Sequence, residues 1–181
     1  MPTTRRPARA GVAARRPSRV VIRAATPADL DAVVSLRLAL LREEARNPLF
    51  ARARRDLPSR VADLTALQLS ATGEVTLLAL HGADAIGILR ATSSRGTRLV
   101  HPLRYGFLTS AYVRPAHRRA GVLRRLLEGA EAWCRDQGLT EVRLHCALEN
   151  VEGNQAWDAL GYAPAEVVRR RVLPPRPRRS E

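Results

Sequence analysis

The sequence predicts a single α/β (α+β) domain in which a mixed central sheet is flanked by helices, in the order β-α-α-β-β-β-α-β-α-β. Three observations predict this class. The chain has 181 residues, enough for one domain and short for two. Its composition, 45% hydrophobic and 27% charged, is that of a globular protein rather than of a disordered chain. Short β-branched runs alternate along the chain with apolar residues at helical spacing.

The amino-terminal part predicts one strand followed by two helices. Residues 20–22 are β-branched, and Thr26-Pro27 then supplies a helix cap with proline at the first helical position. A broad apolar stripe continues the first helix to about Ala45. Two prolines interrupt the pattern before apolar spacing predicts a second helix over residues 61–69.

The central part predicts three strands. Residues 75–80 and 86–91 are β-type runs on either side of a tight turn at 82–84, which indicates an antiparallel hairpin. Residues 92–104 contain Ser, Gly, His and Pro and predict a loop. A longer strand then covers residues 105–113.

The carboxyl-terminal part predicts two more helices and two more strands. The clearest helical pattern covers residues 121–137, with Gly138 as its C-terminal cap. Alternation predicts a strand at 142–146, a short helix follows at 151–160, and residues 167–173 predict the last strand.

The charge distribution predicts a domain at residues 19–173 between two tails. All 31 basic residues are arginines, and the formal net charge is +14. Residues 1–18, which we expect to be disordered, hold five arginines and no acid, and residues 174–181 form a Pro/Arg-rich tail. Because most of the excess charge lies towards the ends, the sequence disfavours a nucleic-acid-binding domain. A nucleic-acid-associated role of the tails remains an alternative.

Three absences in the sequence bear on compartment and cofactor class. Cys134 and Cys146 have no second pair, so the sequence supports neither a disulfide framework nor a zinc site, and we expect no metal. The first 18 residues lack the apolar segment of a secretory signal. No apolar run approaches the length needed to span a bilayer. The sequence therefore predicts a cytoplasmic protein without a membrane span.

A basic turn that contains glycine lies between the third central strand and the long helix. Such a turn presents unpaired backbone N–H groups and the positive end of the helix dipole to an anion. Gly121 allows close approach of the backbone to a ligand, and Arg118, Arg119 and Arg124 can add hydrogen bonds to phosphate oxygens. The turn predicts a phosphate site, and a solvated arginine-rich helix start is the alternative.

This turn resembles the pyrophosphate-binding signature of the GCN5-related N-acetyltransferase (GNAT) superfamily, Gln/Arg-x-x-Gly-x-Gly/Ala. Here it reads Arg118-Arg119-Ala120-Gly121-Val122-Leu123, after a strand end that reads Tyr112-Val113-Arg114-Pro115. A second family motif matches Asn150, Gly153, Trp157 and Gly161-Tyr162. The resemblance covers about residues 19–173 and rests on both motifs in the right order, with a strand between them.

The resemblance implies a GNAT-like fold and an acetyl-CoA-dependent N-acetyltransferase. The pantetheine arm of acetyl-CoA would lie between the fourth and fifth strands, and a backbone N–H near Tyr112 and Val113 would polarise the thioester carbonyl. No general acid or base is assigned, because the fourth strand carries no carboxylate. The implied cofactor-binding residues are Tyr112, Val113, Arg118, Arg119, Ala120, Gly121, Val122, Leu123, Arg124, Asn150 and Trp157.

The acceptor implied by the resemblance is a primary amine of a small molecule or a peptide. Residues 42–60 hold six arginines and three acids, and in the implied fold they border the acceptor side. This charge favours an amine that bears a carboxylate or phosphate over a polycation. A CoA-binding module with weak or no catalysis is the alternative that Leu123 and Trp157 raise. The oligomeric state, a homodimer included, is left open.

Overall fold

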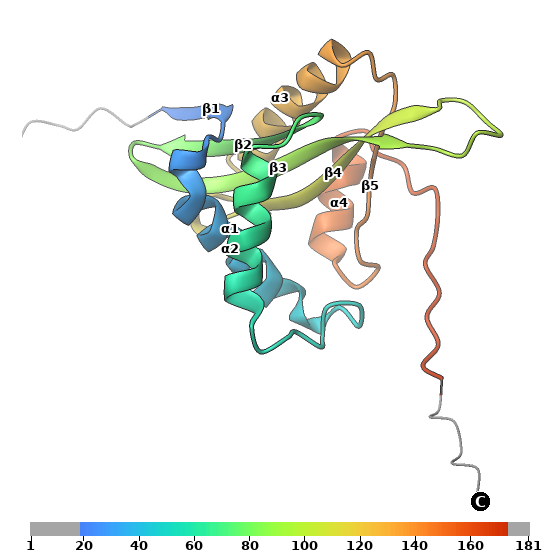
Figure 1. Ribbon diagram of the computed structural model, residues 1–181, viewed down its shortest axis with the longest axis horizontal. Coiled ribbons are helices and arrows are strands. Elements are labelled where there is room, and N and C mark those ends of the chain that lie inside the picture. The colour runs from blue at the N-terminus through green and yellow to red at the C-terminus, as the bar shows by residue number, and fades with distance from the viewer. Residues whose placement is uncertain (1–18, 174–181) are drawn as a thin grey trace, which may run out of the picture. The chain divides into compact units, whose positions relative to one another are not determined.

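Five strands form one mixed sheet in the computed structural model, which describes residues 19–173 (Figure 1). Every strand pairs with the strand before it in the chain, so the sheet order is β1-β2-β3-β4-β5. The first three pairings are antiparallel, and β4 pairs with β5 in parallel. The strands are β1 (Val20–Ala24), β2 (Glu74–His81), β3 (Asp84–Arg95), β4 (Arg104–Val113) and β5 (Val142–Leu144).

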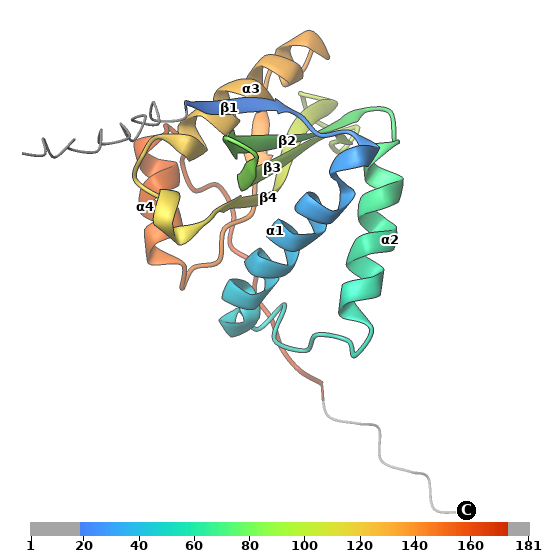
Figure 2. The ribbon, with the colours of Figure 1, turned by 90° about the vertical axis from the view of Figure 1, so that its left-hand side faces the viewer.

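Three α-helices lie in the connections between these strands. The connection from β1 to β2 contains α1 (Leu30–Glu43) and α2 (Leu57–Leu69), and α3 (Val122–Asp136) connects β4 to β5. Short 3₁₀ turns flank them: Pro27–Asp29 leads into α1, Glu44–Arg46 follows it, and Pro115–His117 leads towards α3. Figure 2 shows α1 and α2 side by side and α3 apart from them.

The two faces of the sheet are covered by different helices because side chains alternate along each strand. On one face, Val33 and Leu36 of α1 pack against Leu78 of β2 and its neighbours on β3 and β4. On the other face α3 lies close to the strands: a Cβ added at Gly129 of α3 would lie 3.0 Å from a methyl group of Leu77. The core is therefore built from both faces of β2, β3 and β4.

The described residues fall into two compact units that divide between His145 and Cys146. The first holds the sheet and α1 to α3. The second contains α4 (Val151–Ala159), whose first turn is capped by the side chain of Asn150. Within this unit the rings of Trp157 and Tyr162 meet edge to face, with centroids 5.5 Å apart.

Most predicted elements are confirmed, some with shifted bounds: the strand predicted at 142–146 is β5, which ends at Leu144. Two larger corrections remain. The predicted loop at 92–104 is shorter, because β3 continues to Arg95 and pairs with the start of β4. The predicted last strand at 167–173 is wrong: this described segment forms no ladder, and Val167, Val168 and Val172 are exposed. A β-branched run becomes a strand only where a neighbouring strand accepts its hydrogen bonds. The predicted tails, 1–18 and 174–181, lie outside the described residues.

Candidate functional site

An open edge of β4 is the first feature of the site. Strand β5 pairs with β4 only through residues Gly106 to Leu108, whereas β3 accompanies β4 as far as Val113. Among the described strands, none pairs with the outer edge of β4 from Thr109 onward. The edge therefore offers backbone N–H and C=O groups to a ligand that lies beside it like an additional strand.

A β-bulge reshapes β4 where this edge opens. The register between β3 and β4 shifts between Ile88 and Arg90, so that one residue of β3, Leu89, opposes two residues of β4, Ser110 and Ala111. Ser110 lies in the bulge with φ of 53°, in the left-handed region that few residues other than glycine adopt. The bulge turns the strand at the point where β5 diverges from it.

The turn that leads into α3 forms the second feature. Gly121 is the N-cap of α3 with φ of 74°, and Arg119 also has a positive φ, of 59°. The first hydrogen bond of the helix runs from Arg125 N to Gly121 O at 3.1 Å. The N–H groups of the first turn, on Val122, Leu123 and Arg124, thus have no acceptor within the helix. Together with the helix dipole, these N–H groups are suited to bind an anion.

Arg118 connects the end of β4 to the end of α1. Its guanidinium group donates to both carboxylate oxygens of Glu43, at 2.8 and 2.7 Å, and its Nε donates to Val113 O at 2.9 Å. The same group lies over the ring of Tyr112, 5.7 Å from the centroid. The predicted phosphate ligand Arg118 is thus engaged with protein groups. Arg118, Arg119 and Arg124 are all exposed at the turn.

Tyr112 and Val113 lie inside the protein rather than at its surface. Their relative exposures are 7% and 8%, and Tyr112 belongs to the core cluster under α1. Burial and the nearby carboxylate of Glu43 raise the pKa of the Tyr112 phenol, so it stays neutral at physiological pH. Of the groups on these two residues, the backbone therefore remains the part suited to a ligand on the open edge.

Asn150 and Trp157, the two predicted cofactor-binding residues of the second unit, both have structural roles within that unit. The Asn150 side chain accepts a hydrogen bond from Gly153 N at 2.9 Å and so caps α4. A Cβ at Gly153 would lie 2.5 Å from Asn150 Nδ2, which explains the small residue three positions later. Trp157 is buried at 9% exposure. The Asn-x-x-Gly pair is a helix-capping motif in its own right.

Two features of the site escaped sequence reasoning. The first is the β-bulge, because the segment Thr109-Ser110-Ala111 contains no glycine that would indicate a left-handed residue. Its one signal in the sequence is the spacing of the inward-facing residues Thr109 and Tyr112, which are three positions apart instead of two. The ion pair of Glu43 with Arg118 joins residues far apart in the sequence and has no local signal.

The structure combines an antiparallel sheet, a parallel fifth strand that diverges from β4 and a glycine turn at a helix N-terminus. This is the arrangement expected of a transferase of CoA-bound acyl groups. The chain belongs to the acetyltransferase (GNAT) family, whose model matches residues 38–162. It is an acetyl-CoA-dependent N-acetyltransferase, as the two motifs predicted.

Similar proteins include two aminoglycoside N(6')-acetyltransferases of type 1. The one from Stenotrophomonas maltophilia is 34% identical over 151 residues, which are 81% of this chain and 88% of that protein. The one from Acinetobacter haemolyticus is 33% identical over 129 residues, 69% of this chain and 84% of that protein. Much of the length of each relative is thus represented in this chain.

Solved structures share the fold. The crystal structure of an aminoglycoside antibiotic 6'-N-acetyltransferase from Acinetobacter haemolyticus has a TM-score of 0.69 and 26% identity, covering 86% of this chain and 99% of that one. A predicted acetyltransferase with acetyl-CoA from Clostridium acetobutylicum has a TM-score of 0.71 and 16% identity, covering 85% and 96%. In the described residues, no helix has the length and apolarity needed to cross a membrane.

Proposed function

We propose that acetyl-CoA binds along the open edge of β4 and that its pyrophosphate lies on the first-turn amides of α3. The unpaired edge and the left-handed Gly121 support this placement. A neutral primary amine then attacks the thioester carbonyl carbon, so that a C–N bond forms and the C–S bond breaks. The nitrogen loses one proton to water, and the departing CoA thiolate takes one up. A backbone N–H near Tyr112 and Val113 donates to the oxyanion that forms during the attack. The chain's residues mainly position the two reactants.

The acceptor proposed here is a small molecule whose primary amine is accompanied by a carboxylate or a phosphate. The observation that carries this proposal is a hollow of about 240 Å³ between the end of α1 and the start of α2. Apolar side chains such as Leu41, Phe50 and Leu57 line it together with Arg52 and Arg54. Such a lining suits the apolar part of the acceptor, and its two arginines would attract the acceptor's negative charge from solution.

Ion pairs leave this segment positive. Asp56 is paired with both Arg54 and Arg60, at 3.1 and 2.6 Å, and Glu43 is paired with Arg118 at 2.7 Å. Two of the three acids at positions 42–60 are thus already compensated. Arg52 and Arg55 are exposed beside them. A polycationic acceptor would meet repulsion there, and an anionic group would meet attraction.

The second candidate acceptor is an aminoglycoside. Its support is the similarity to curated aminoglycoside N(6')-acetyltransferases over most of their length. An aminoglycoside carries several amines and no carboxylate, so the two candidates differ in the sign of their charge.

A matched acceptor panel separates the candidates. Purified full-length protein is incubated with acetyl-CoA, CoA release is followed by a thiol reagent, and the acetylated amine is identified by mass spectrometry. The panel pairs L-phenylalanine with L-phenylalaninamide and phosphoethanolamine with ethanolamine, and adds kanamycin. We expect the anionic member of a pair to have the higher kcat/KM. Efficient acetylation of kanamycin alone would establish the second candidate.

Charge reversal tests the arginines of the hollow. Replacing Arg52, Arg54 and Arg55 together by Glu should raise KM for the anionic acceptor and leave KM for acetyl-CoA nearly unchanged, which makes acetyl-CoA the internal control. The difference should shrink as salt is added, because the Debye length falls from ~30 Å at 0.01 M to ~3 Å at 1 M. A KM that ignores both salt and the reversal would contradict the proposed role of these residues.

A further inference from the structure

The face of the sheet under α1 and α2 changes from apolar to polar between two neighbouring rows of residues. The apolar row, in register across β2, β3 and β4, consists of Leu78, Ile88 and Tyr112. The next row along the strands consists of Thr76, Arg90 and Thr109. Thr76 is 7% exposed and the Arg90 side chain 18%. A charged side chain is thus placed at a largely enclosed position where the sheet needs no polar group.

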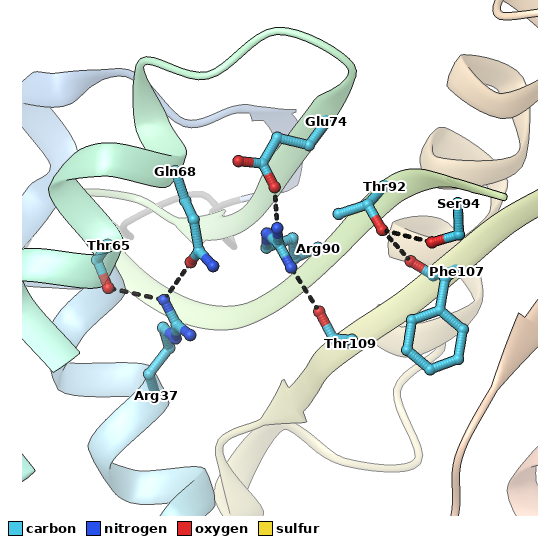
Figure 3. Close-up of polar contacts among 9 residues, drawn as sticks. All are labelled: Arg37, Thr65, Gln68, Glu74, Arg90, Thr92, Ser94, Phe107 and Thr109. Carbon is cyan, nitrogen blue, oxygen red and sulfur yellow. Dashed lines mark hydrogen bonds and ion pairs between the residues drawn. The ribbon is translucent and has the colours of Figure 1, made fainter. Parts of the chain in front are cut away.

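Arg90 has one hydrogen-bond donor that its neighbours do not satisfy. Its guanidinium group pairs with Glu74 of β2 and donates to Thr109 Oγ1 at 3.3 Å (Figure 3). Its Nε is buried and has no hydrogen-bond partner. A buried donor without an acceptor costs about 1–3 kcal/mol, and more in a charged group. The unpaired Nε indicates that an acceptor atom is missing beside Arg90.

A second arginine lies beside this group. Arg37 of α1 donates from one nitrogen to Thr65 Oγ1 at 2.8 Å and to Gln68 Oε1 at 2.6 Å, both on α2 (Figure 3). Both of these partners are neutral, and no carboxylate of the described residues pairs with Arg37. Burial lowers the pKa of Arg37, and burial together with the charge of Arg37 lowers the pKa of Arg90.

The charges of this cluster do not balance. Two guanidinium groups face one carboxylate, that of Glu74, which leaves one positive charge in a half-buried setting. Charges removed from water are normally paired, since the desolvation of an isolated ion is costly. The cluster therefore lacks one negative group with acceptor oxygens.

The cluster also lies next to the reaction site. Thr109, which Arg90 contacts, directly precedes the left-handed Ser110 of the bulge, where the edge of β4 opens. A ligand group held by the two arginines would stand close to the acetyl group that the proposed function places on that edge.

We propose that Arg37 and Arg90 form a subsite that binds the carboxylate of the acceptor and thereby positions its amine for attack. This inference rests on the proposed function: the exposed arginines of residues 52–55 attract the acceptor's negative charge from solution, and Arg37 and Arg90 hold its carboxylate during the reaction. The carboxylate accepts from Arg90 Nε and from guanidinium N–H groups of Arg37, which supplies the missing acceptor and balances the charge. Recognition of a planar anion by two guanidinium groups would exclude a polycation from the same place.

The test compares a carboxylate with its amide in variants of the full chain. In Arg37→Gln, KM for L-phenylalanine should rise about 10-fold or more, since a charge-assisted hydrogen bond is lost. KM for L-phenylalaninamide and for acetyl-CoA should stay the same. Arg135→Gln, which removes an exposed arginine of α3, is the matched control and should leave all three values unchanged. Arg37→Lys, which keeps the charge, should retain part of the preference.

Arg90 requires a paired change, because Arg90→Gln alone would leave the buried Glu74 without its partner. The double variant Glu74→Gln/Arg90→Gln should lose the preference for L-phenylalanine over its amide. Phosphoethanolamine distinguishes a phosphate subsite from a carboxylate subsite. If Arg37→Gln raises KM more for phosphoethanolamine than for L-phenylalanine, the subsite is built for phosphate. Equal losses for carboxylate and amide would overturn the subsite and leave these arginines a purely structural role.

A binding measurement keeps this inference separate from the proposed function. If the wild type acetylates no carboxylate of the panel, the acceptor class is wrong. The subsite is then tested by the rise in Tm with millimolar sodium acetate over sodium chloride at equal ionic strength. A rise in the wild type and Arg135→Gln that is absent in Arg37→Gln supports an anion site between the arginines. The same rise in all three proteins overturns it.

Discussion

Gly121 is the residue at which the proposed cofactor site can be tested most directly. Its φ is 74°, and a Cβ built on it meets no other atom within 4 Å. Gly121→Asp therefore places a carboxylate in open space where the pyrophosphate is proposed to lie. We expect acetyl-CoA binding to be lost, measured by isothermal titration calorimetry, while the protein stays folded.

The other end of the same helix provides the control for that variant. Gly138 follows α3 with φ of 70° and equally open surroundings. Gly138→Asp imposes similar backbone strain, of the order of 1 kcal/mol, at a distance from the proposed cofactor. Acetyl-CoA affinity should be unchanged in it. Equal affinity in both variants would place the pyrophosphate elsewhere.

Packing between β4 and α3 depends on Gly106, a residue of β4 that has no side chain. A Cβ at Gly106 would lie 2.5 Å from Sγ of Cys134, which is buried in α3. Gly106→Ala should therefore lower the free energy of unfolding by about 1–3 kcal/mol, measured by urea denaturation. In a Cys134→Ala background the same change should cost much less, because the clashing atom is gone. An additive pair would argue against direct contact.

The junction of β1 with α1 gives stability that depends on pH. Asp29 accepts two hydrogen bonds from Arg23, both 2.7 Å, and one from Thr26 N at 2.8 Å. Hydrogen bonding to Arg23 first, then to Thr26, lowers the pKa of the Asp29 carboxyl in the folded state. The ionised Asp29 carboxylate therefore contributes to the free energy of unfolding above the pKa of the unfolded state, near 3.9. This contribution is lost as the pH falls through the lower pKa of the folded state.

Asp29→Asn measures this contribution. The variant should be less stable than the wild type by about 1–2 kcal/mol at pH 7. The difference should narrow as the pH is lowered below about 4, in chemical denaturation at a series of pH values. Asp31→Asn, an exposed aspartate two residues later, should show no such gap. A gap that is constant down to pH 2 would contradict the ionic origin.

At the scale of the whole molecule, ligand binding and folding are linked. A ligand that binds only the folded state adds about 2.7 kcal/mol at a concentration 100 times its Kd. For a chain of this size this corresponds to a rise in Tm of roughly 5–10 °C. We expect such a rise with acetyl-CoA in the wild type by differential scanning calorimetry. No rise at millimolar acetyl-CoA would contradict binding to the folded chain.

Local patterns predicted most of this fold, since amphipathic spacing marks α3 and the hairpin of β2 and β3 without reference to the rest of the chain. What the sequence missed depends on pairing between distant segments. Residues 92–95 are polar, and only the facing start of β4 makes them a strand. Residues 167–173 have the opposite character and form none. The cluster of Arg37 and Arg90 is likewise invisible until α1 lies on the sheet.

The identity of sheet order and chain order has a consequence for how the protein folds. No strand has to insert between two strands that have already paired, because each one adds to the edge left by its predecessor. The meander of β2, β3 and β4 needs only short loops to close, so its contacts are close in sequence and form early. Strands β1 and β5 join across the connections that contain α1, α2 and α3, and should dock later. Pulse-labelled amide exchange should accordingly protect the amides of β2, β3 and β4 before those of β1 and β5, although β1 is synthesised first.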